Sequence, residues 1–263
     1  MVSGKQVRLS RILVDGKMLC VPMDHGVSSG PIKGIDRIHD VIRMIEDGGA
    51  TAIIVHKGII KSLDKPLKLG MIMHASGSTS LSSYPNWKVQ VATVQEALRL
   101  GADAVSVHVN IGGDEDQDML MKLGMLADEC DSWSMPFIAM MYPRGKNIKD
   151  PRDPEAIAHV ARVGAELGAD IVKVPMPSFD PSEIRKITKT CTSPIVAAGG
   201  PKMDDDRKVL ELAEAVMKAG GIGVTFGRNI FQHENPRLMV KALRAIIIDG
   251  RSVDEALKIL RGE

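Results

Sequence analysis

The chain of 263 residues contains eight short apolar runs separated by longer amphipathic stretches, and this alternation constrains its fold more than any other feature. The runs cover residues 18–25, 51–58, 69–76, 102–110, 136–143, 169–176, 194–201 and 221–229. They are nearly continuous in hydrophobic residues, which is typical of parallel strands buried on both faces. Eight strand–helix repeats in a chain of this length predict an α/β fold, the (β/α)8 TIM barrel, as a single domain over residues 1–263. A doubly wound open sheet is the alternative.

Helix signals lie between the runs. Residues 35–50 form an amphipathic pattern that stops at two glycines, and Thr93 and Glu96 have the spacing of a capping box. The region after the third run is irregular, because residues 77–87 are rich in serine and glycine and residues 88–93 could form a ninth strand. We expect this region to be an excursion between the third and fourth strands.

Composition excludes several classes of protein. The net charge is +1 with 25% charged residues, and no basic stripe indicates a nucleic-acid partner. The three cysteines are far apart and form no CxxC pair, so we expect neither disulfides nor structural zinc, and we expect a reducing compartment, the cytoplasm. No apolar run approaches the roughly 18 residues of a membrane span.

Polar residues gather where the predicted strands end, and active sites of barrels lie at the carboxyl ends of the strands. The set comprises Asp24, His25, His56, Lys57, His74, His108, Asn110, Tyr142, Pro143, Arg144, Lys173, Gly199, Gly200, Gly227 and Arg228. Lys173 stands out because its neighbours in the run are apolar. Burial would depress its pKa and leave a neutral amine that can form a Schiff base with a carbonyl. The alternative is a structural ion pair with a carboxylate such as Asp24.

Two glycine-rich segments end the last two runs. Gly199 and Gly200 follow the seventh, and Gly227 and Arg228 follow the eighth. Barrel phosphate sites often use these two loops, where glycine lets backbone N–H groups approach phosphate oxygens. The pattern predicts phosphate binding; tight strand–helix turns are the alternative.

Proton transfer requires further groups, and Tyr142 and Asp24 are the best placed. A rival hypothesis uses the histidines at residues 25, 56, 74 and 108, two or three of which could hold a divalent metal with Asp24 in a metal-dependent aldolase or hydrolase. They lack HxH or HxxxH spacing, so packed or hydrogen-bonded histidines are favoured, and we expect no metal and no cofactor.

Six motifs together resemble the archaeal-type class I aldolases: VPMDHGVSSGPIKGI, VSVHVNIGGDED, MMYPRGKNIKDPRDPE, GADIVK, VAAGGPK and GVTFGRNIFQH. They span residues 20–235. The resemblance implies a TIM barrel with a Schiff-base lysine at Lys173, a proton donor at Tyr142 and a proton acceptor at Asp24. It implies substrate contacts at Asp24, His25, Gly26, Val27, Ser28, Tyr142, Pro143, Arg144 and Lys173, and phosphate contacts at Gly199, Gly200, Gly227 and Arg228.

The resemblance also implies the kind of reaction. One branch of the family takes a ketose phosphate such as 6-deoxy-5-ketofructose 1-phosphate, releases a three-carbon phosphate and adds the remaining enamine to L-aspartate semialdehyde, on a route to 3-dehydroquinate and aromatic amino acids. Other members are fructose-bisphosphate aldolases or join dihydroxyacetone phosphate to aspartate semialdehyde. The family commonly forms homo-oligomers built from rings of about five subunits, up to decamers. This sequence departs from the family after Lys173, where VPMPSFD replaces an expected polar run of the type T-x-Y-T-G-D.

Overall fold

The computed structural model describes residues 2–263, and eight parallel strands in it close into a barrel. The barrel strands are β1 Met18–Pro22, β2 Ala52–Val55, β3 Gly70–His74, β6 Ala104–Ile111, β7 Phe137–Pro143, β8 Ile171–Val174, β9 Ile195–Ala198 and β10 Gly223–Thr225. Their order around the barrel is β1-β10-β9-β8-β7-β6-β3-β2. Each falls on one of the eight predicted runs, with β6 extending one residue beyond the run 102–110, so the predicted TIM barrel is confirmed and the open sheet is wrong.

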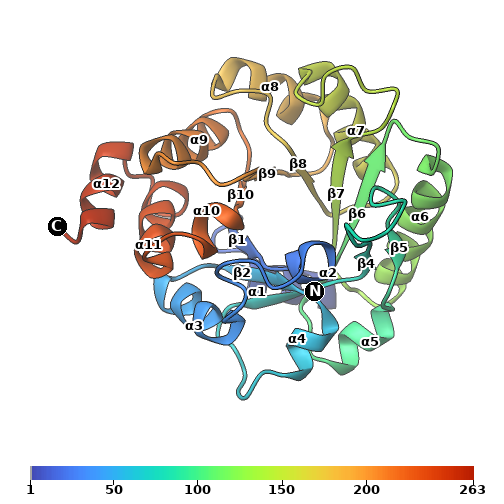
Figure 1. Cartoon of the computed structure of the whole chain (residues 1–263), viewed down its shortest axis with the longest axis horizontal. Coiled ribbons are helices and arrows are strands. Elements are labelled where there is room, and N and C mark those ends of the chain that lie inside the picture. The colour runs from blue at the N-terminus through green and yellow to red at the C-terminus, as the bar shows by residue number, and fades with distance from the viewer. Residues whose placement is uncertain (1) are drawn as a thin grey trace.

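Helices surround the strands in a ring (Figure 1). Those between strands or after the last one are α3 Ile38–Gly48, α4 Lys57–Lys61, α5 Val94–Arg99, α6 Asp116–Ser132, α7 Pro154–Glu166, α8 Pro181–Thr190, α9 Asp206–Lys218, α11 Pro236–Ile247 and α12 Val253–Arg261. Two short helices, α2 His25–Ser29 and α10 Arg228–Phe231, follow β1 and β10. None of the helices in residues 2–263 combines the length and the apolar character that crossing a lipid bilayer requires.

Local sequence signals explain where these helices start and stop. Helix α3 ends at Gly49, whose φ of 86° is left-handed and favours glycine. Thr93 caps α5 by accepting a hydrogen bond from the Glu96 N–H at 3.2 Å. The predicted capping box is only half formed, because the Glu96 carboxylate instead binds Lys57 at 3.0 Å and Lys61 at 3.4 Å.

The excursion between the third and fourth barrel strands is a small antiparallel ribbon of β4 Ser76–Gly77 and β5 Val89–Gln90. This confirms the prediction that residues 77–93 leave the barrel, and residues 89–90 are the short strand that the pattern of 88–93 allowed. The ribbon follows β3 at its carboxyl end, so it lies beside the mouth of the barrel.

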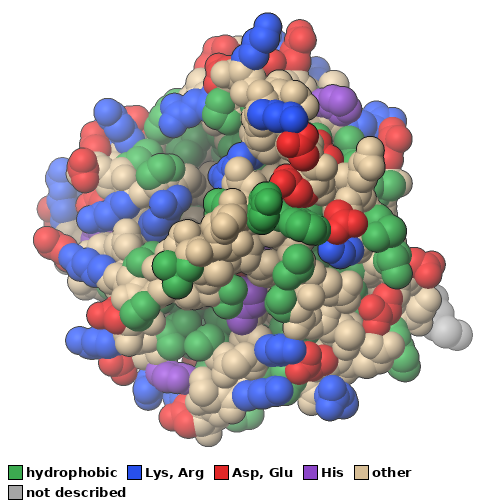
Figure 2. Space-filling model, turned by 45° about the vertical axis from the view of Figure 1, so that its right-hand side comes forward, with side chains coloured by type: hydrophobic (Ala, Val, Ile, Leu, Met, Phe, Trp, Pro, Cys, Tyr) green, Lys and Arg blue, Asp and Glu red, His purple; other side chains and the backbone are tan. Residues whose placement is uncertain are grey.

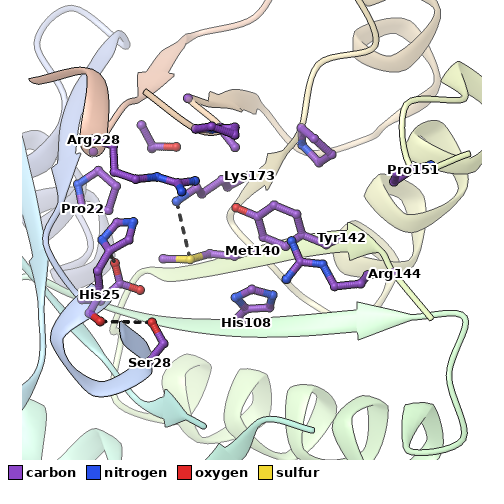
Figure 3. A pocket seen from close by; sticks show the side chains of 18 of the residues that line it. Pro22, His25, Ser28, His108, Met140, Tyr142, Arg144, Pro151, Lys173 and Arg228 are labelled. Carbon is purple, nitrogen blue, oxygen red and sulfur yellow. Dashed lines mark hydrogen bonds and ion pairs between the residues drawn. The ribbon is translucent and has the colours of Figure 1, made fainter. Parts of the chain in front are cut away.

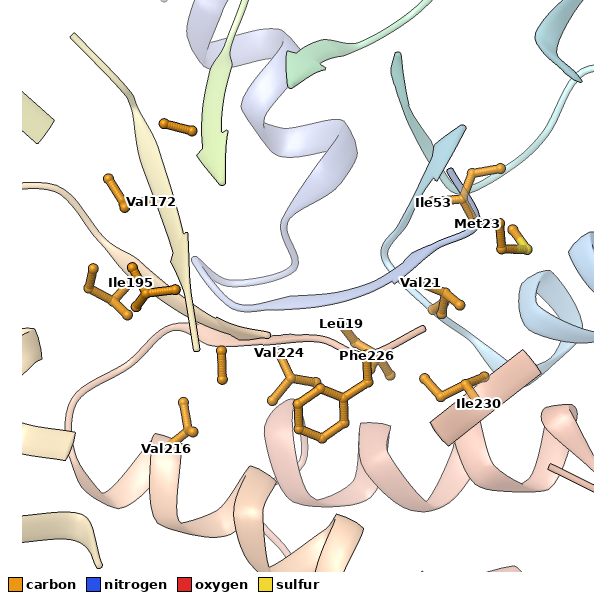
Figure 4. Close-up of a cluster of buried hydrophobic side chains, with 14 of the residues drawn as sticks. Leu19, Val21, Met23, Ile53, Val172, Ile195, Val216, Val224, Phe226 and Ile230 are labelled. Atoms are coloured by element: carbon orange, nitrogen blue, oxygen red, sulfur yellow. The ribbon is translucent and has the colours of Figure 1, made fainter. Parts of the chain in front are cut away.

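Side chains alternate between two cores along each strand. Leu19 and Val21 point outward to the helices, in the cluster drawn in Figure 4, whereas Met18 and Cys20 point into the barrel. Helix α1 Gly4–Ile12 covers the opposite end of the barrel, since Ile12 is fully buried in the inner cluster. Lys5 of this helix binds Asp170, just before β8, at 3.1 Å. The barrel interior is therefore closed at its amino end.

The outer surface matches the balanced composition. Acidic and basic side chains are interspersed over the face shown in Figure 2, and no single sign of charge dominates it.

Candidate active site

A cavity of about 790 Å³ opens at the carboxyl end of the barrel. Every barrel strand contributes to its wall, through a residue in its carboxyl-terminal half or directly after it: Pro22, His56, His74, His108, Tyr142, Lys173, Ala198 and Thr225. Parallel strands that all end at one face bring these residues together although they are far apart in the sequence.

Lys173 lies inside the barrel. It shares the inward face of β8 with Ile171, while Val172 and Val174 point outward to the helices. Its side chain lines the cavity, the residue is only 5% exposed, and the Nζ atom lies 3.7 Å from the Sδ atom of Met140 on β7. Within residues 2–263 no carboxylate oxygen lies within 4.0 Å of this amine, so the alternative of a structural ion pair with Asp24 is wrong.

Tyr142 stands next to this lysine because it follows Met140 by two residues on the same strand face. Met140 is in register with Lys173, and Tyr142 continues the wall toward the mouth. Its ring stacks on His108 with centroids 4.6 Å apart, and the Arg144 guanidinium lies 5.3 Å from the ring centroid. Figure 3 shows Lys173 between Arg228 and Tyr142, with Arg144 beyond the tyrosine. Pro143 also lines the cavity.

Asp24 directly precedes helix α2, which lies at the mouth. Its carboxylate oxygens lie 3.7 Å from His25 Nδ1 and 3.7 Å from His74 Nε2. Burial opposes ionisation of Asp24, but the charges of His74, His25 and Lys173 outweigh it and hold its pKa below the ordinary value. Asp24 is therefore a carboxylate at neutral pH.

The rest of the DHGVS motif divides into two groups. His25, Val27 and Ser28 line the cavity, whereas Gly26 is exposed and does not line it. Ser28 donates a hydrogen bond to the His25 carbonyl at 3.1 Å, which stiffens the short helix.

The histidines are hydrogen-bonded or packed against one another. His74 Nδ1 lies 2.9 Å from Ser106 Oγ and its Nε2 lies 3.2 Å from Ser76 Oγ. His108 Nε2 lies 2.8 Å from Asn110 Oδ1, and the His56 ring packs edge-on against His74. Burial lowers the pKa of His74 to about 3, against the opposing charge of Asp24. In the part of the chain that the structure describes, no group of three or more His, Cys, Asp or Glu side chains is arranged to hold a metal ion.

The two glycine-rich loops meet on one side of the cavity, which we call the glycine side: Gly199, Gly200, Gly227 and Arg228. Asn229 ties the loops together, since its Nδ2 donates to the Gly199 carbonyl at 2.9 Å and its Oδ1 accepts from the Met203 N–H at 2.7 Å. Gly200 has a φ of 65°, and a Cβ atom on Gly227 would stand 2.8 Å from the Pro22 carbonyl oxygen. The loops are thus shaped by backbone packing that needs glycine.

Arg228 adds a cation to the glycine side. It is half-buried, and its Nε atom is buried without a hydrogen-bond partner in residues 2–263. Figure 3 shows its side chain directed toward Lys173.

Sequence reasoning missed several residues of the cavity. Lys88, from the ribbon, lines the cavity, and the hydroxyls of Ser76 and Ser106 hold His74. Lys88 carried a usable signal, because the loop after a barrel strand is where active sites form and it is the one cation in the excursion. We call Lys88 and Arg144 the ribbon side of the cavity.

A (β/α)8 barrel that buries an unpaired lysine amine in the cavity at its open end, with a tyrosine and a carboxylate lining the same cavity, has the fold of an aldolase and groups suited to its chemistry. The comparison with known proteins agrees, and this chain belongs to the DeoC/LacD family of aldolases, which it matches over residues 18–233.

Three relatives show which aldolases are similar. The chain is 39% identical to 2-amino-3,7-dideoxy-D-threo-hept-6-ulosonate synthase 1 of Archaeoglobus fulgidus, over 97% of this chain and 95% of that protein. It is 36% identical to 2-amino-4,5-dihydroxy-6-oxo-7-(phosphonooxy)heptanoate synthase of Streptomyces griseus, over 88% of this chain and 85% of that protein. Among solved structures, a Schiff base forming fructose-1,6-bisphosphate aldolase is 26% identical with a TM-score of 0.87, covering 93% of this chain and all of the other.

Proposed function

We propose that this aldolase forms 2-amino-3,7-dideoxy-D-threo-hept-6-ulosonate from L-aspartate semialdehyde and a ketose phosphate, 6-deoxy-5-ketofructose 1-phosphate, through an imine on Lys173. The observation that carries the proposal is the buried Lys173 amine, which lines the cavity and has no carboxylate partner within 4.0 Å in residues 2–263. Since desolvating an unpaired cation is costly, a lysine at such a position suits a nucleophile better than a structural ion.

The reaction uses Lys173 to exchange one carbon–carbon bond for another. The amine adds to the ketone carbon, and loss of water leaves the imine. Removal of the proton from the hydroxyl on the β carbon breaks the bond between the α and β carbons. Its electron pair forms the enamine double bond, the imine electrons move to nitrogen, and the three-carbon phosphate leaves as an aldehyde. The enamine carbon then attacks the aldehyde carbon of L-aspartate semialdehyde, whose oxygen takes up a proton. Water finally hydrolyses the imine.

Tyr142 and Asp24 move the protons in this scheme. Tyr142 donates, because its hydroxyl lies on the strand beside Lys173 and lines the cavity. Asp24 accepts, because its lowered pKa keeps it ionised at neutral pH and it faces the same cavity. The substrate is contacted from the cavity walls by His25, Val27, Ser28, Pro143 and Arg144. Gly26 lies outside the cavity, in the short helix α2 that carries His25, Val27 and Ser28.

The name of the Archaeoglobus relative, 39% identical over nearly its whole length, supports this product. The Streptomyces relative is named for a seven-carbon 2-amino acid that keeps a phosphate beside its 6-oxo group. The glycine side supports this second candidate, in which dihydroxyacetone phosphate is joined to aspartate semialdehyde. A phosphate on the carbon next to the imine carbon would lie toward Gly199, Gly200, Gly227 and Arg228. A fructose-bisphosphate aldolase would use the same contacts.

The wider setting follows from the same proposal. The product leads toward 3-dehydroquinate and aromatic amino acids, and the substrates are small phosphorylated molecules. We assign the enzyme to the cytoplasm on its cysteine usage, since Cys20, Cys130 and Cys191 are all unpaired. We further propose that residues 1–263 form one domain and that the protein assembles as a homo-oligomer, up to a decamer.

Chemical trapping tests the proposal. Incubation with the ketose phosphate and borohydride should reduce the imine to a stable adduct, and peptide mass mapping should place it on Lys173. Lys173→Met keeps the apolar stem and should lose the adduct and at least about 10³-fold in turnover. Lys57→Met removes a nearby lysine that already pairs with Glu96, so it serves as the matched control. An adduct on Lys57, or full turnover by Lys173→Met, would overturn the assignment.

A metal-dependent aldolase is the rival class, and chelation separates the two. Activity should survive treatment with EDTA followed by its removal, because the imine is the electron sink. Activity lost to EDTA and restored by zinc, cobalt or manganese would favour the rival.

A further inference from the structure

Lys88 and Arg144 bring two positive charges to the ribbon side of the cavity, and no acidic side chain forms a close ion pair with either of them. Within residues 2–263, no carboxylate oxygen lies within 4.0 Å of either side-chain cation, although both residues line the cavity. The other lysine and arginine residues that line the cavity, Arg152, Lys173, Lys202 and Arg228, also have no carboxylate oxygen within 4.0 Å in residues 2–263, so the cavity as a whole suits anionic substrates. Two uncompensated cations that share one concave wall repel each other unless an anion comes between them.

Lys88 is held at this wall by a series of hydrogen bonds. Asn110, at the end of β6, donates to the Asn86 carbonyl of the ribbon at 2.7 Å. The Lys88 Nζ atom donates to Ser78 Oγ and, at 3.2 Å, to the Pro85 carbonyl. These partners are neutral oxygens, so they orient the ammonium without cancelling its charge. Burial lowers the pKa of Lys88, the charge of Arg144 lowers it further, and the more distant charge of Asp24 opposes both.

The position of the pair relative to Lys173 suggests what it binds. Arg228 and the glycine side lie on one side of the Lys173 amine, and Arg144 lies on the other side, beyond Tyr142 (Figure 3). A fragment held as an imine on Lys173 has one end toward Arg228. The bond that breaks and the bond that forms belong to the same carbon of this fragment, so the leaving and the entering aldehyde both occupy the ribbon side.

We propose that Lys88 and Arg144 form a second anion site, which binds the terminal carboxylate of the acceptor aldehyde and, before it, the phosphate of the leaving fragment. The planar guanidinium matches a carboxylate or a phosphate with two parallel hydrogen bonds, and the lysine adds a point charge. The site deepens the proposed function and rests on it, since it assigns the group that an acceptor must carry.

The test compares aldehydes that differ in one group. Succinic semialdehyde keeps the carboxylate of aspartate semialdehyde, and butyraldehyde has a methyl group in its place. With the same donor, the ratio of their kcat/KM values cancels any effect on donor binding. Lys88→Met should lower this ratio about 10-fold or more, the usual value of a hydrogen bond to a charged group. The ratio of kcat/KM for glyceraldehyde 3-phosphate to that for glyceraldehyde tests in the same way whether the site binds the phosphate of the leaving fragment.

Two variants serve as controls. Lys88→Arg keeps the charge and should keep most of the wild-type ratio. Lys122→Met removes a neighbouring charge that pairs with Asp118 at 3.2 Å and does not line the main cavity, so its ratio should equal that of wild type. An unchanged ratio in Lys88→Met, or an equal fall in Lys122→Met, would overturn the proposal.

A binding measurement keeps the two hypotheses separate. Calorimetric titration with succinate needs no turnover, and Lys88→Met should weaken that binding about 10-fold relative to wild type. If borohydride places no adduct on Lys173 while succinate binding still depends on Lys88, the proposed function fails and the anion site stands. If the adduct forms and succinate binding is the same in Lys88→Met as in wild type, the anion site fails alone.

Discussion

The glycine side and the ribbon side of the cavity present cations in two different ways. On the glycine side the backbone is fixed, since Asn229 joins both loops and Gly227 has no room for a Cβ atom. On the ribbon side the cations come from an added hairpin and from an exposed arginine after β7. In the proposed function, this difference means that the barrel itself would hold one end of the substrate and the added ribbon side would hold the other. Residues of the ribbon side can change without disturbing the barrel, so we expect this side to determine which acceptor aldehyde the enzyme uses.

Tyr142 stands between the two sides, so its removal should lower turnover more than a change on either side alone. Tyr142→Phe should lower turnover about 10²–10⁴-fold with every donor and acceptor, because one proton donor serves both half-reactions. The adduct on Lys173 should still form, since the nucleophile remains. Steady-state rates and borohydride trapping measure the two effects. Tyr84→Phe, on the exposed tip of the ribbon, is the control, and equal losses in both variants would contradict the role of Tyr142.

Arg228→Gln should affect one class of donor. Dihydroxyacetone phosphate carries its phosphate beside the imine carbon, so its binding should weaken about 10–100-fold on loss of a charged hydrogen-bond donor. A ketose whose phosphate lies on the leaving fragment should bind nearly as before. The KM values of both donors, measured for wild type and Arg228→Gln, test this difference. The same loss of affinity with both donors would show that Arg228 does not bind only a phosphate beside the imine carbon.

Gly200→Val should strain the glycine side. The φ of 65° at Gly200 is left-handed, and a side chain there costs roughly 1–2 kcal/mol of stability. Gly250 has a φ of 70° with similar open space and lies far from the cavity, so Gly250→Val is the matched control. Urea unfolding should show similar losses in both, whereas only Gly200→Val should weaken dihydroxyacetone phosphate binding. Unchanged phosphate affinity in a folded Gly200→Val would remove this loop from the phosphate site.

The smallest effect concerns His74, which joins the barrel to the ribbon through Ser76. Its folded-state pKa is about 3, below the ordinary value near 6.5, so the unfolded chain takes up a proton first as the pH falls. Its contribution to stability is therefore complete above about pH 6.5 and is lost progressively toward pH 3, by about 1–2 kcal/mol between pH 7 and pH 5. His74→Gln cannot charge and should show a shallower decline.

Urea unfolding midpoints at pH 7 and pH 5 measure this decline. The pKa values of His25, His56 and His108 are also lowered, chiefly by burial, so part of the slope should remain in the variant. A slope equal to that of wild type would show that His74 does not stay neutral in the folded protein.

The sequence predicted the barrel because its signal is periodic and local. Eight apolar runs gave all eight strands, although the strands are shorter than the runs: the run 169–176 contains β8 Ile171–Val174, since proline at 175 cannot donate to the strand ladder. Lys173 could be located because strand alternation and the carboxyl-end rule act together. The roles of the site residues stay predictions.

The ribbon side was harder to predict from sequence. Lys88 reaches the cavity through contacts with Ser78, Pro85 and, by way of Asn86, the distant Asn110, and no periodicity encodes such contacts. The hydroxyl partners of His74 were missed for the same reason, because Ser106 lies 32 positions away on the neighbouring strand.

Helix α1 has a consequence for the kinetics. Because Ile12 closes the amino end of the barrel, substrates can reach the interior only through the cavity at the carboxyl end. The leaving aldehyde therefore has to diffuse out through this opening before the acceptor aldehyde can enter, so product release precedes acceptor binding. Initial-rate plots against acceptor at several donor concentrations should accordingly give parallel lines, the pattern of a substituted-enzyme cycle.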